Sequence, residues 1–292
     1  MSQDSAADAG PPTLRDQEDP GTERLAQAHG PDELSCALLA LLLPKGSRAA
    51  LVVWQLETKA TPYATRIRGE AIALGAAARL PWFELLLARM AGQPLRQRRA
   101  LLAATRRLMR APRAVPTRPA PQPHLLESAR GSVRPIDTLH WLVMRRRLGE
   151  KAPQAAATAA DRGFSRLSES DVYAIGRVTA FLSRLVPVES ADGQAGAAWY
   201  ASVMRRWQGH VDLPGQLPLP DTDAFVRALR SVATLPWMQR PVLVREWVSA
   251  ALQTSPSGAL ADAGADALRM CATLLDSPLP PELAKHYIEP LR

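Results

Sequence analysis

Cysteine and aromatic residues are scarce in this chain of 292 residues, and their scarcity excludes two kinds of architecture. The two cysteines, Cys36 and Cys271, lie in apolar stretches of helical character. This pattern excludes a disulfide framework and predicts buried free thiols in a reducing compartment. Aromatic residues make up 5% of the chain, and runs of Val, Ile, Tyr and Phe are rare. Because strands favour those residues whereas helices favour the abundant Ala and Leu, the composition predicts an all-α helical bundle of about ten helices.

A hydrophobic run long enough to cross a membrane is also missing. The longest apolar run, residues 34–43, ends at Pro44 and has about half the length that a membrane-spanning helix needs. The first residues are acidic and polar, unlike a secretory signal. We therefore expect a cytoplasmic protein, either free or peripherally bound at the inner membrane.

Local motifs for metal, phosphate or nucleophilic chemistry do not occur in the sequence. The five histidines are widely spaced, and neither His-Glu-x-x-His nor Cys-x-x-Cys is present. Gly-x-x-x-x-Gly-Lys, Gly-x-Gly-x-x-Gly and Gly-x-Ser-x-Gly are missing as well. We expect no metal, no cofactor and no catalytic residue. A site assembled from distant residues is the alternative, because a three-dimensional triad leaves no local trace.

Two small polar groups are the candidates for such a site. Glu127, Asp137 and His140 could form an acid/base cluster, although a lone histidine on a helix more often has a structural role. Asp221 and Asp223 resemble a metal-binding pair, but their place before an apolar segment favours a helix cap.

Charge divides the chain into three parts. Residues 1–33 contain eight acidic residues and two arginines, residues 34–150 contain twenty Lys and Arg and six acidic residues, and residues 151–292 contain fourteen of each sign. We expect a disordered acidic tail over residues 1–24, a basic helical domain over residues 25–150 and a second helical domain over residues 151–292. The two domains either pack together or stand apart. Five prolines in residues 111–124 predict an extended loop within the basic domain.

Apolar periodicity and helix breakers predict the helices. The most clearly amphipathic segment is Leu95–Arg110, and residues 196–208 place five large apolar side chains at the spacing of a buried helix face. Residues 151–165 predict either a helix or a linker. The other helices are expected at residues 31–43, 49–58, 63–80, 82–91, 136–147, 171–186, 224–234, 241–252, 263–275 and 281–288.

A stripe of arginines follows the helix expected at residues 95–110. Its members fall within roughly 100° of one another on a helical wheel, opposite the leucines. A second basic cluster ends the helix expected at residues 136–147. Such a surface binds a protein partner or a polyanion, either an anionic membrane surface or, with less support, nucleic acid; a solvated face is the alternative. The candidate binding residues are Arg96, Arg99, Arg106, Arg107, Arg110, Arg145, Arg146 and Arg147.

One helix-pair pattern occurs twice, at a constant offset of 142 residues. Its first copy contains Met90, Pro94, Arg98, Leu101 and Leu102. Its second copy contains Val232, Pro236, Arg240, Leu243 and Val244. The first copy leads through Arg130-Gly131-Ser132-Val133-Arg134-Pro135-Ile136-Asp137, and the second through Ser257-Gly258-Ala259-Leu260 into Asp276-Ser277-Pro278-Leu279-Pro280-Pro281.

These loops and this ending resemble the TerB-like helical domain, in particular the C-terminal cytosolic region of HtpX-type membrane zinc metallopeptidases. The resemblance covers about residues 33–150 and 220–284, and it implies two degenerate helix-pair repeats. Arg130, Ser257 and Gly264 stand where the family's loops have acidic residues, whereas Asp137 occupies an acidic place. Because hard cations need oxygen ligands and His-Glu-x-x-His is missing, the resemblance implies neither cation binding nor peptidase activity.

A repeat that keeps its apolar skeleton and loses its acidic residues favours a scaffold over an enzyme. We expect a non-catalytic, cytosolic helical module for protein interaction or regulation. The resemblance implies a membrane protease or another membrane complex as its partner. The alternative is a polyanion-binding protein that uses the arginine-rich face.

Overall fold

The computed structural model describes residue 28 and residues 30–42, 76–110, 134–149, 167–187, 194–208 and 218–287. All regular structure in these ranges is helical and no strand occurs there, which confirms the predicted all-α fold. The helices of this part are α2 (Pro31–Leu42), α5 (Ala76–Ala91), α6 (Leu95–Arg110), α8 (Pro135–Leu148), α9 (Glu169–Leu182), α10 (Gln194–Gln208), α11 (Thr222–Ala233), α12 (Gln239–Thr254), α13 (Asp262–Leu274) and α14 (Pro281–Lys285). The predicted acidic tail over residues 1–24, the segments at 49–58 and 151–165 and the loop at 111–124 lie outside the described residues.

Local signals in the sequence fix the starts of several helices. α6 has the predicted bounds, and α8 begins with Pro135 at its first position, where proline costs no hydrogen bond. Ser168 and Asp171 form a capping box at the start of α9. Asp221 caps α11 by accepting a hydrogen bond from the backbone N–H of Ala224 at 2.7 Å, so the interpretation of this aspartate as a helix cap is confirmed.

α5 corrects one sequence prediction, because we expected a break between residues 80 and 82. The helix continues through Pro81, although an internal proline removes one backbone hydrogen bond and costs about 3 kcal/mol. Leu80, Phe83, Leu87 and Met90 are all buried along this helix. Burying these four side chains, each at roughly 1.5–3 kcal/mol, outweighs the cost of the proline.

Aromatic side chains join three helices of the second half. Trp199 of α10 donates its indole N–H to the backbone oxygen of Trp247 at 3.2 Å, and Trp247 of α12 donates its own indole N–H to Oγ1 of Thr179 at 3.0 Å. Both tryptophans are fully buried, and Thr179 belongs to α9. The apolar side chains at residues 196–208 therefore form core, as their spacing predicts.

The sequence repeat corresponds to a repeat in helix packing. α2 packs on α5 as α9 packs on α11, and α6 packs on α8 as α12 packs on α13. The offset of 142 residues relates Phe83 to Phe225 and Met90 to Val232, and all four side chains are buried. Equivalent positions of the two copies therefore lie on the buried faces of their helices.

The repeated arginine has the same role in both copies. Nη1 of Arg98 in α6 donates to the backbone oxygen of Leu148, the last residue of α8, at 3.3 Å. Nη1 of Arg240 in α12 donates to the backbone oxygen of Leu275, directly after α13, at 2.8 Å. Each guanidinium thus meets the carbonyl end of the helix that its own helix packs against, where the helix dipole favours a cation.

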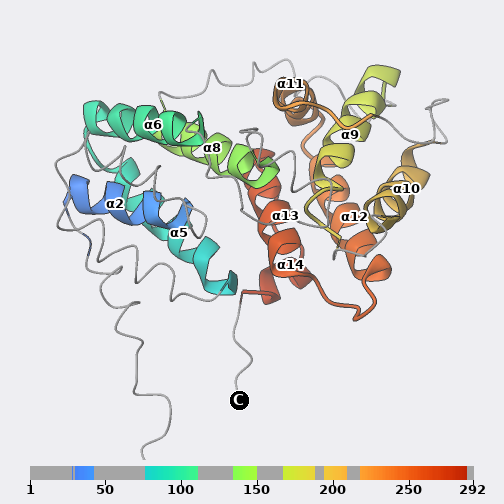
Figure 1. Cartoon of the computed structure of the whole chain (residues 1–292). Coiled ribbons are helices and arrows are strands. Elements are labelled where there is room, and N and C mark those ends of the chain that lie inside the picture. Colours follow the sequence, from blue (N-terminus) through green and yellow to red (C-terminus); the bar gives the residue numbers. More distant parts are fainter. Residues whose placement is uncertain are drawn as a thin grey trace, which may run out of the picture.

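The two repeats meet through α13. This helix packs against α5 and α8 of the first repeat and against α12 of its own, and Figure 1 shows it between the two groups of helices. Nη1 of Arg146 in α8 donates to the backbone oxygen of Leu274 at 2.6 Å, and the same guanidinium pairs with Asp276. The described buried residues form one continuous core, to which both repeats contribute.

Two cysteines and one glycine lie in closely packed parts of the core. Cys36 and Cys271 are buried free thiols, as predicted, and burial raises the pKa of Cys36 to about 12. Gly264 lies where α13 begins, so close to the turn after α9 that a Cβ atom would lie 2.4 Å from the backbone oxygen of Val186.

None of the helices in the described ranges combines the length and apolar character that a membrane span requires.

Candidate functional site

The arginine stripe lies on α6, and its described members face outward. Arg96, Arg99 and Arg106 are exposed, whereas Leu101 and Ala104 of the same helix are buried. The side chains of Arg107 and Arg110 lie outside the described part of the structure. Three of the five predicted arginines are thus seen to share the solvent side of α6.

The arginines of α8 do not act as one group. All three are exposed, but Arg146 donates to the backbone oxygen of Leu274 and pairs with Asp276 at the end of α13. Consecutive helical residues point about 100° apart, so this triplet presents no common face. Arg146 therefore has a structural role in joining the repeats.

The acid/base candidates of the first repeat are drawn into the helix packing. Arg134 donates to both carboxylate oxygens of Asp137, at 2.9 and 2.7 Å, across the first turn of α8. The ring of His140 stands edge-on to Phe83 at 5.1 Å between centroids, and its Nδ1 is buried without a hydrogen-bond partner. Burial lowers the pKa of His140 to about 4, although Asp137 opposes this shift. His140 is therefore neutral at physiological pH; Glu127 lies outside the described residues.

The loops that the resemblance singled out hold no group of metal ligands in the described part. Asp137 faces Arg134, and Ser257 and Ser255 share a hydrogen bond between their hydroxyl groups at 3.1 Å. Among the described residues, no three His, Cys, Asp or Glu side chains gather closely enough to hold a metal ion.

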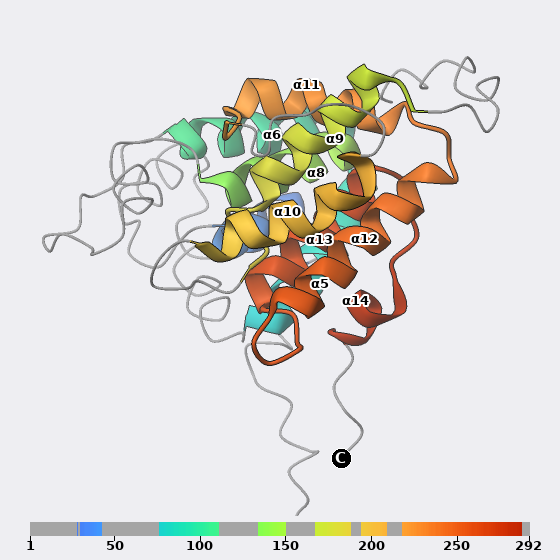
Figure 2. The same cartoon turned by 90° about the vertical axis from the view of Figure 1, so that its right-hand side faces the viewer.

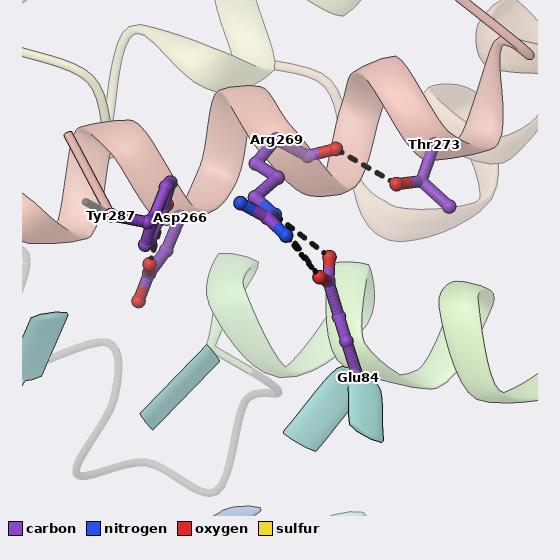
Figure 3. A network of polar contacts seen from close by, with 5 residues as sticks. All are labelled: Glu84, Asp266, Arg269, Thr273 and Tyr287. Atoms are coloured by element: carbon purple, nitrogen blue, oxygen red, sulfur yellow. Dashed lines mark hydrogen bonds and ion pairs between the residues drawn. The ribbon is translucent and has the colours of Figure 1, made fainter. Parts of the chain in front are cut away.

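A network of polar side chains joins α5, α13 and the turn after α14. Arg269 of α13 donates to both carboxylate oxygens of Glu84 in α5, with a shortest distance of 2.5 Å. The guanidinium carbon of Arg269 lies 4.5 Å from the ring centroid of Tyr287, whose hydroxyl donates to Asp266 at 2.8 Å. Thr273 donates to the backbone oxygen of Arg269 at 3.1 Å (Figure 3). The network therefore connects α5 of the first repeat and the C-terminal turn to α13.

Burial sets the electrostatics of this network. It raises the pKa of Asp266 to about 7; Asp262 and Glu84 add to the rise, whereas the hydrogen bond from Tyr287 and the charge of Arg269 oppose it. Burial also raises the pKa of Tyr287 and lowers that of Arg79, whose Nε is buried without a partner. Asp266 can therefore hold or release one proton near neutral pH. The hydroxyl group that donates to Asp266 belongs to Tyr287 of the same chain.

A second contact holds the same turn. Nε2 of His286 lies 3.1 Å from a carboxylate oxygen of Asp262, one helical turn before Asp266. Leu283 of α14 is fully buried beneath this turn. The polar network thus fixes a short apolar element against α13.

The sequence did not indicate this network. Glu84 and Arg269 are 185 residues apart, and ion pairs between distant helices leave no pattern in a single sequence. The available signal was the spacing of Asp262, Asp266 and Arg269, which puts their side chains on one face of a helix.

Exposed apolar side chains gather at the turn between α11 and α12. Trp237 is 71% exposed and the neighbouring Met238 is 46% exposed, whereas Leu235 of the same turn is buried. Leu219, before α11, is another exposed large apolar residue, at 56%. A tryptophan this exposed is unusual, because the other tryptophans described in the structure are buried or partly buried.

Comparisons with known proteins assign no relative. No family model matches the chain, and neither a curated protein nor a solved structure matches it. The relation to TerB-like domains therefore stays a prediction.

Proposed function

We propose that this chain is a cytoplasmic, non-catalytic helical module that binds a protein partner through the turn between α11 and α12. The observation that carries the proposal is the exposure of Trp237 beside Met238. Tryptophan contributes more binding energy at protein interfaces than most residues do, and burying this pair would remove a large apolar area from water.

The backbone of this turn supports the proposal, because it is held in place without a partner. The backbone N–H of Leu235 donates to the oxygen of Val232 at 3.1 Å, and that of Gln239 donates to the oxygen of Pro236 at 2.8 Å. Arg240 ties the start of α12 to Leu275, and the side chain of Leu235 is buried below. A side chain presented on a fixed backbone loses little conformational entropy on binding, which is a property of good binding sites.

The polar network supports the non-catalytic part of the proposal. Glu84, Asp266, Arg269 and Tyr287 bond to one another across helices. The bonds that these groups make join α5 to α13 and α13 to the C-terminal turn, so each group has a structural partner.

The test is a pull-down with the tagged full chain from soluble and membrane fractions, at low and high salt. We expect a stoichiometric protein partner that survives high salt, since an apolar contact is not screened by ions. Trp237→Ser should lose this partner. Leu219→Ser, which alters another exposed apolar residue before α11, should retain it. Equal recovery of the same proteins by both variants contradicts the proposal.

The arginine face of α6 favours a second candidate function, binding to an anionic membrane surface. Arg96, Arg99 and Arg106 share one side of the helix, and each surface arginine contributes about 1 kcal/mol near anionic lipids. Vesicles with phosphatidylglycerol should bind the chain at low salt, and Arg96→Glu, Arg99→Glu and Arg106→Glu together should abolish binding. Binding that ignores salt or lipid charge excludes this function, and preferential binding to DNA would reassign the face to nucleic acid.

A further inference from the structure

α9 and α11 form an antiparallel pair. The rings of Phe181 and Phe225 stack with centroids 3.7 Å apart, and Nη2 of Arg184 donates to the backbone oxygen of Pro220 at 2.6 Å. Residue numbers thus rise along α9 while they fall along α11, and the two helices lie side by side in both views (Figures 1 and 2). The start of α9 therefore lies at the same end of the pair as the Trp237 turn.

Arginines and an aromatic side chain are exposed along α9 and α11, with Arg230 in the last turn of α11. Tyr173 of α9 is 37% exposed, and Arg177 lies over its ring at 4.7 Å and donates to its hydroxyl at 3.1 Å. Arg227 and Arg230 lie three residues apart on the exposed side of α11. Neither of them makes an ion pair within the described part of the chain.

The opposing charge at this end is small. Asp171 accepts the hydrogen bonds of the capping box, and Glu169 is exposed in the first turn of α9. Asp223 lies one helical turn before Arg227 on the same side of α11 and makes no ion pair within the described part of the chain. Arg227 and Arg230 therefore outnumber the one carboxylate on the exposed side of α11.

Carboxylates are the groups that these arginines fit. A guanidinium pairs with a carboxylate through two parallel hydrogen bonds, and an apolar side chain of the same segment would cover Trp237 and Met238. Stacked nucleotide bases also suit aromatic residues next to arginines. However, residues 151–292 carry equal numbers of positive and negative side chains, so this half lacks the long-range field that nucleic-acid binding needs.

We propose that the surface formed by Trp237, Met238, Arg227 and Arg230 binds a protein segment that carries an apolar anchor next to two or more carboxylates. This inference rests on the proposed function and names the chemistry of its partner. The apolar anchor supplies the attachment, and the arginines select acidic segments and exclude basic ones.

The experiment selects binders from a displayed library of random dodecapeptides on the immobilised full chain. We expect enriched peptides in which a large apolar residue lies near two or more Asp or Glu. Trp237→Ala should weaken the binding of a selected peptide by about tenfold or more, as should the paired change Arg227→Glu and Arg230→Glu. The matched controls Leu219→Ala and Arg205→Glu change exposed residues elsewhere and should stay within about twofold. Thermal melting of each variant establishes that it is folded.

Charge reversal sharpens the test. The chain with Arg227→Glu and Arg230→Glu should select Lys- or Arg-containing peptides with the same apolar anchor. Peptides that depend on Trp237 but show no acidic preference would overturn the inference and leave the proposed function in place. A library without any Trp237-dependent peptide overturns both.

Discussion

Asp266 shows how burial changes the protonation of a carboxyl group that also receives a hydrogen bond. Tyr287 donates to it and Arg269 lies nearby, and both favour the ionised form. Burial outweighs them and raises the pKa of Asp266 to about 7. The position of the side chain between α13 and the C-terminal turn therefore matters more than its hydrogen bond.

Asp266→Asn should change how stability depends on pH. The folded protein holds the Asp266 proton more tightly than the unfolded chain does, so ionisation of Asp266 lowers the free energy of unfolding as pH rises from about 4 to about 7. Asn removes this loss. Near pH 4 the variant and the native chain should have similar free energies of unfolding. Between about pH 4 and 7 the difference in favour of the variant should grow by at most about 1.4 kcal/mol for each pH unit, and above pH 7 it should stay constant.

Urea unfolding of both chains at each pH measures this difference. Tyr287→Phe is the matched variant, because it removes the hydrogen bond that lowers the pKa of Asp266 and should move the window to higher pH. If the free energies of unfolding of the Asp266→Asn variant and the native chain differ by the same amount at every pH, Asp266 does not titrate in this range.

His140 should act in the opposite direction. Because burial lowers the pKa of His140 to about 4, the folded protein favours the neutral ring. The stability that this preference gives is complete above pH 6.5 and is lost as pH falls through about 4. His140→Leu removes the titrating group, so its free energy of unfolding should fall less than that of the native chain between pH 6.5 and 4. Parallel curves for the two chains would exclude a buried, neutral His140.

At the scale of single elements, a residue that is repeated in the sequence has the same role in both copies. Arg98 and Arg240 stood out because both copies of the pattern contain them, and each donates to the carbonyl end of the neighbouring helix. Other features of the elements were beyond the sequence. The break expected at Pro81 does not occur, because the burial that carries α5 through the proline depends on side chains from other helices.

Replacing either repeated arginine by methionine should destabilise the protein to a similar extent. Methionine keeps most of the apolar stem and removes the hydrogen bond to a helix end, so each variant should lose about 1–2 kcal/mol of the free energy of unfolding. Urea denaturation of Arg98→Met and Arg240→Met measures the loss. If one substitution is neutral while the other is severe, the two arginines are not equivalent.

Gly264 should tolerate no side chain, although it occupies a helix. Alanine usually stabilises a helix relative to glycine by about 1 kcal/mol. Here the added Cβ would meet the backbone oxygen of Val186 at 2.4 Å, and backbone atoms cannot move aside cheaply. Gly264→Ala should therefore lower the free energy of unfolding by about 1–3 kcal/mol.

Gly30→Ala is the control for this substitution, because nothing lies within 4 Å of a Cβ at residue 30. Its thermal melting temperature should stay near that of the native chain, while that of Gly264→Ala falls. A Gly264→Ala variant as stable as the native chain would mean that α13 and the turn after α9 are farther apart.

At the scale of the molecule, the sequence predicted helices more fully than it predicted their assembly. The buried faces of α6 and α10 follow from spacing within one segment. The pairing of Glu84 with Arg269 and of Arg146 with Asp276 depends on how α5, α8 and α13 pack, and no local pattern encodes it. For the same reason the exposure of Trp237 could not be predicted: most tryptophans at helical spacing are core, as Trp199 and Trp247 are.

The groups that hold the fold together and the groups that we propose to bind a partner lie in different parts of the molecule. Ionisable groups at the junction of the two repeats bond to one another, whereas Trp237, Met238, Arg227 and Arg230 are exposed on α11 and the turn that follows it. In our account, recognition of a protein partner occurs on this exposed surface, and the polar network holds α5 and the C-terminal turn against α13.

The most direct test of this account is site-specific photo-crosslinking in the native cell. A benzophenone amino acid replaces the exposed Met238 in one chain and Leu219 in another, and both chains keep Trp237. We expect position 238 to crosslink to one protein, at a segment rich in Asp and Glu, and position 219 not to do so. The same crosslinks from both positions, or none from position 238, would contradict this account.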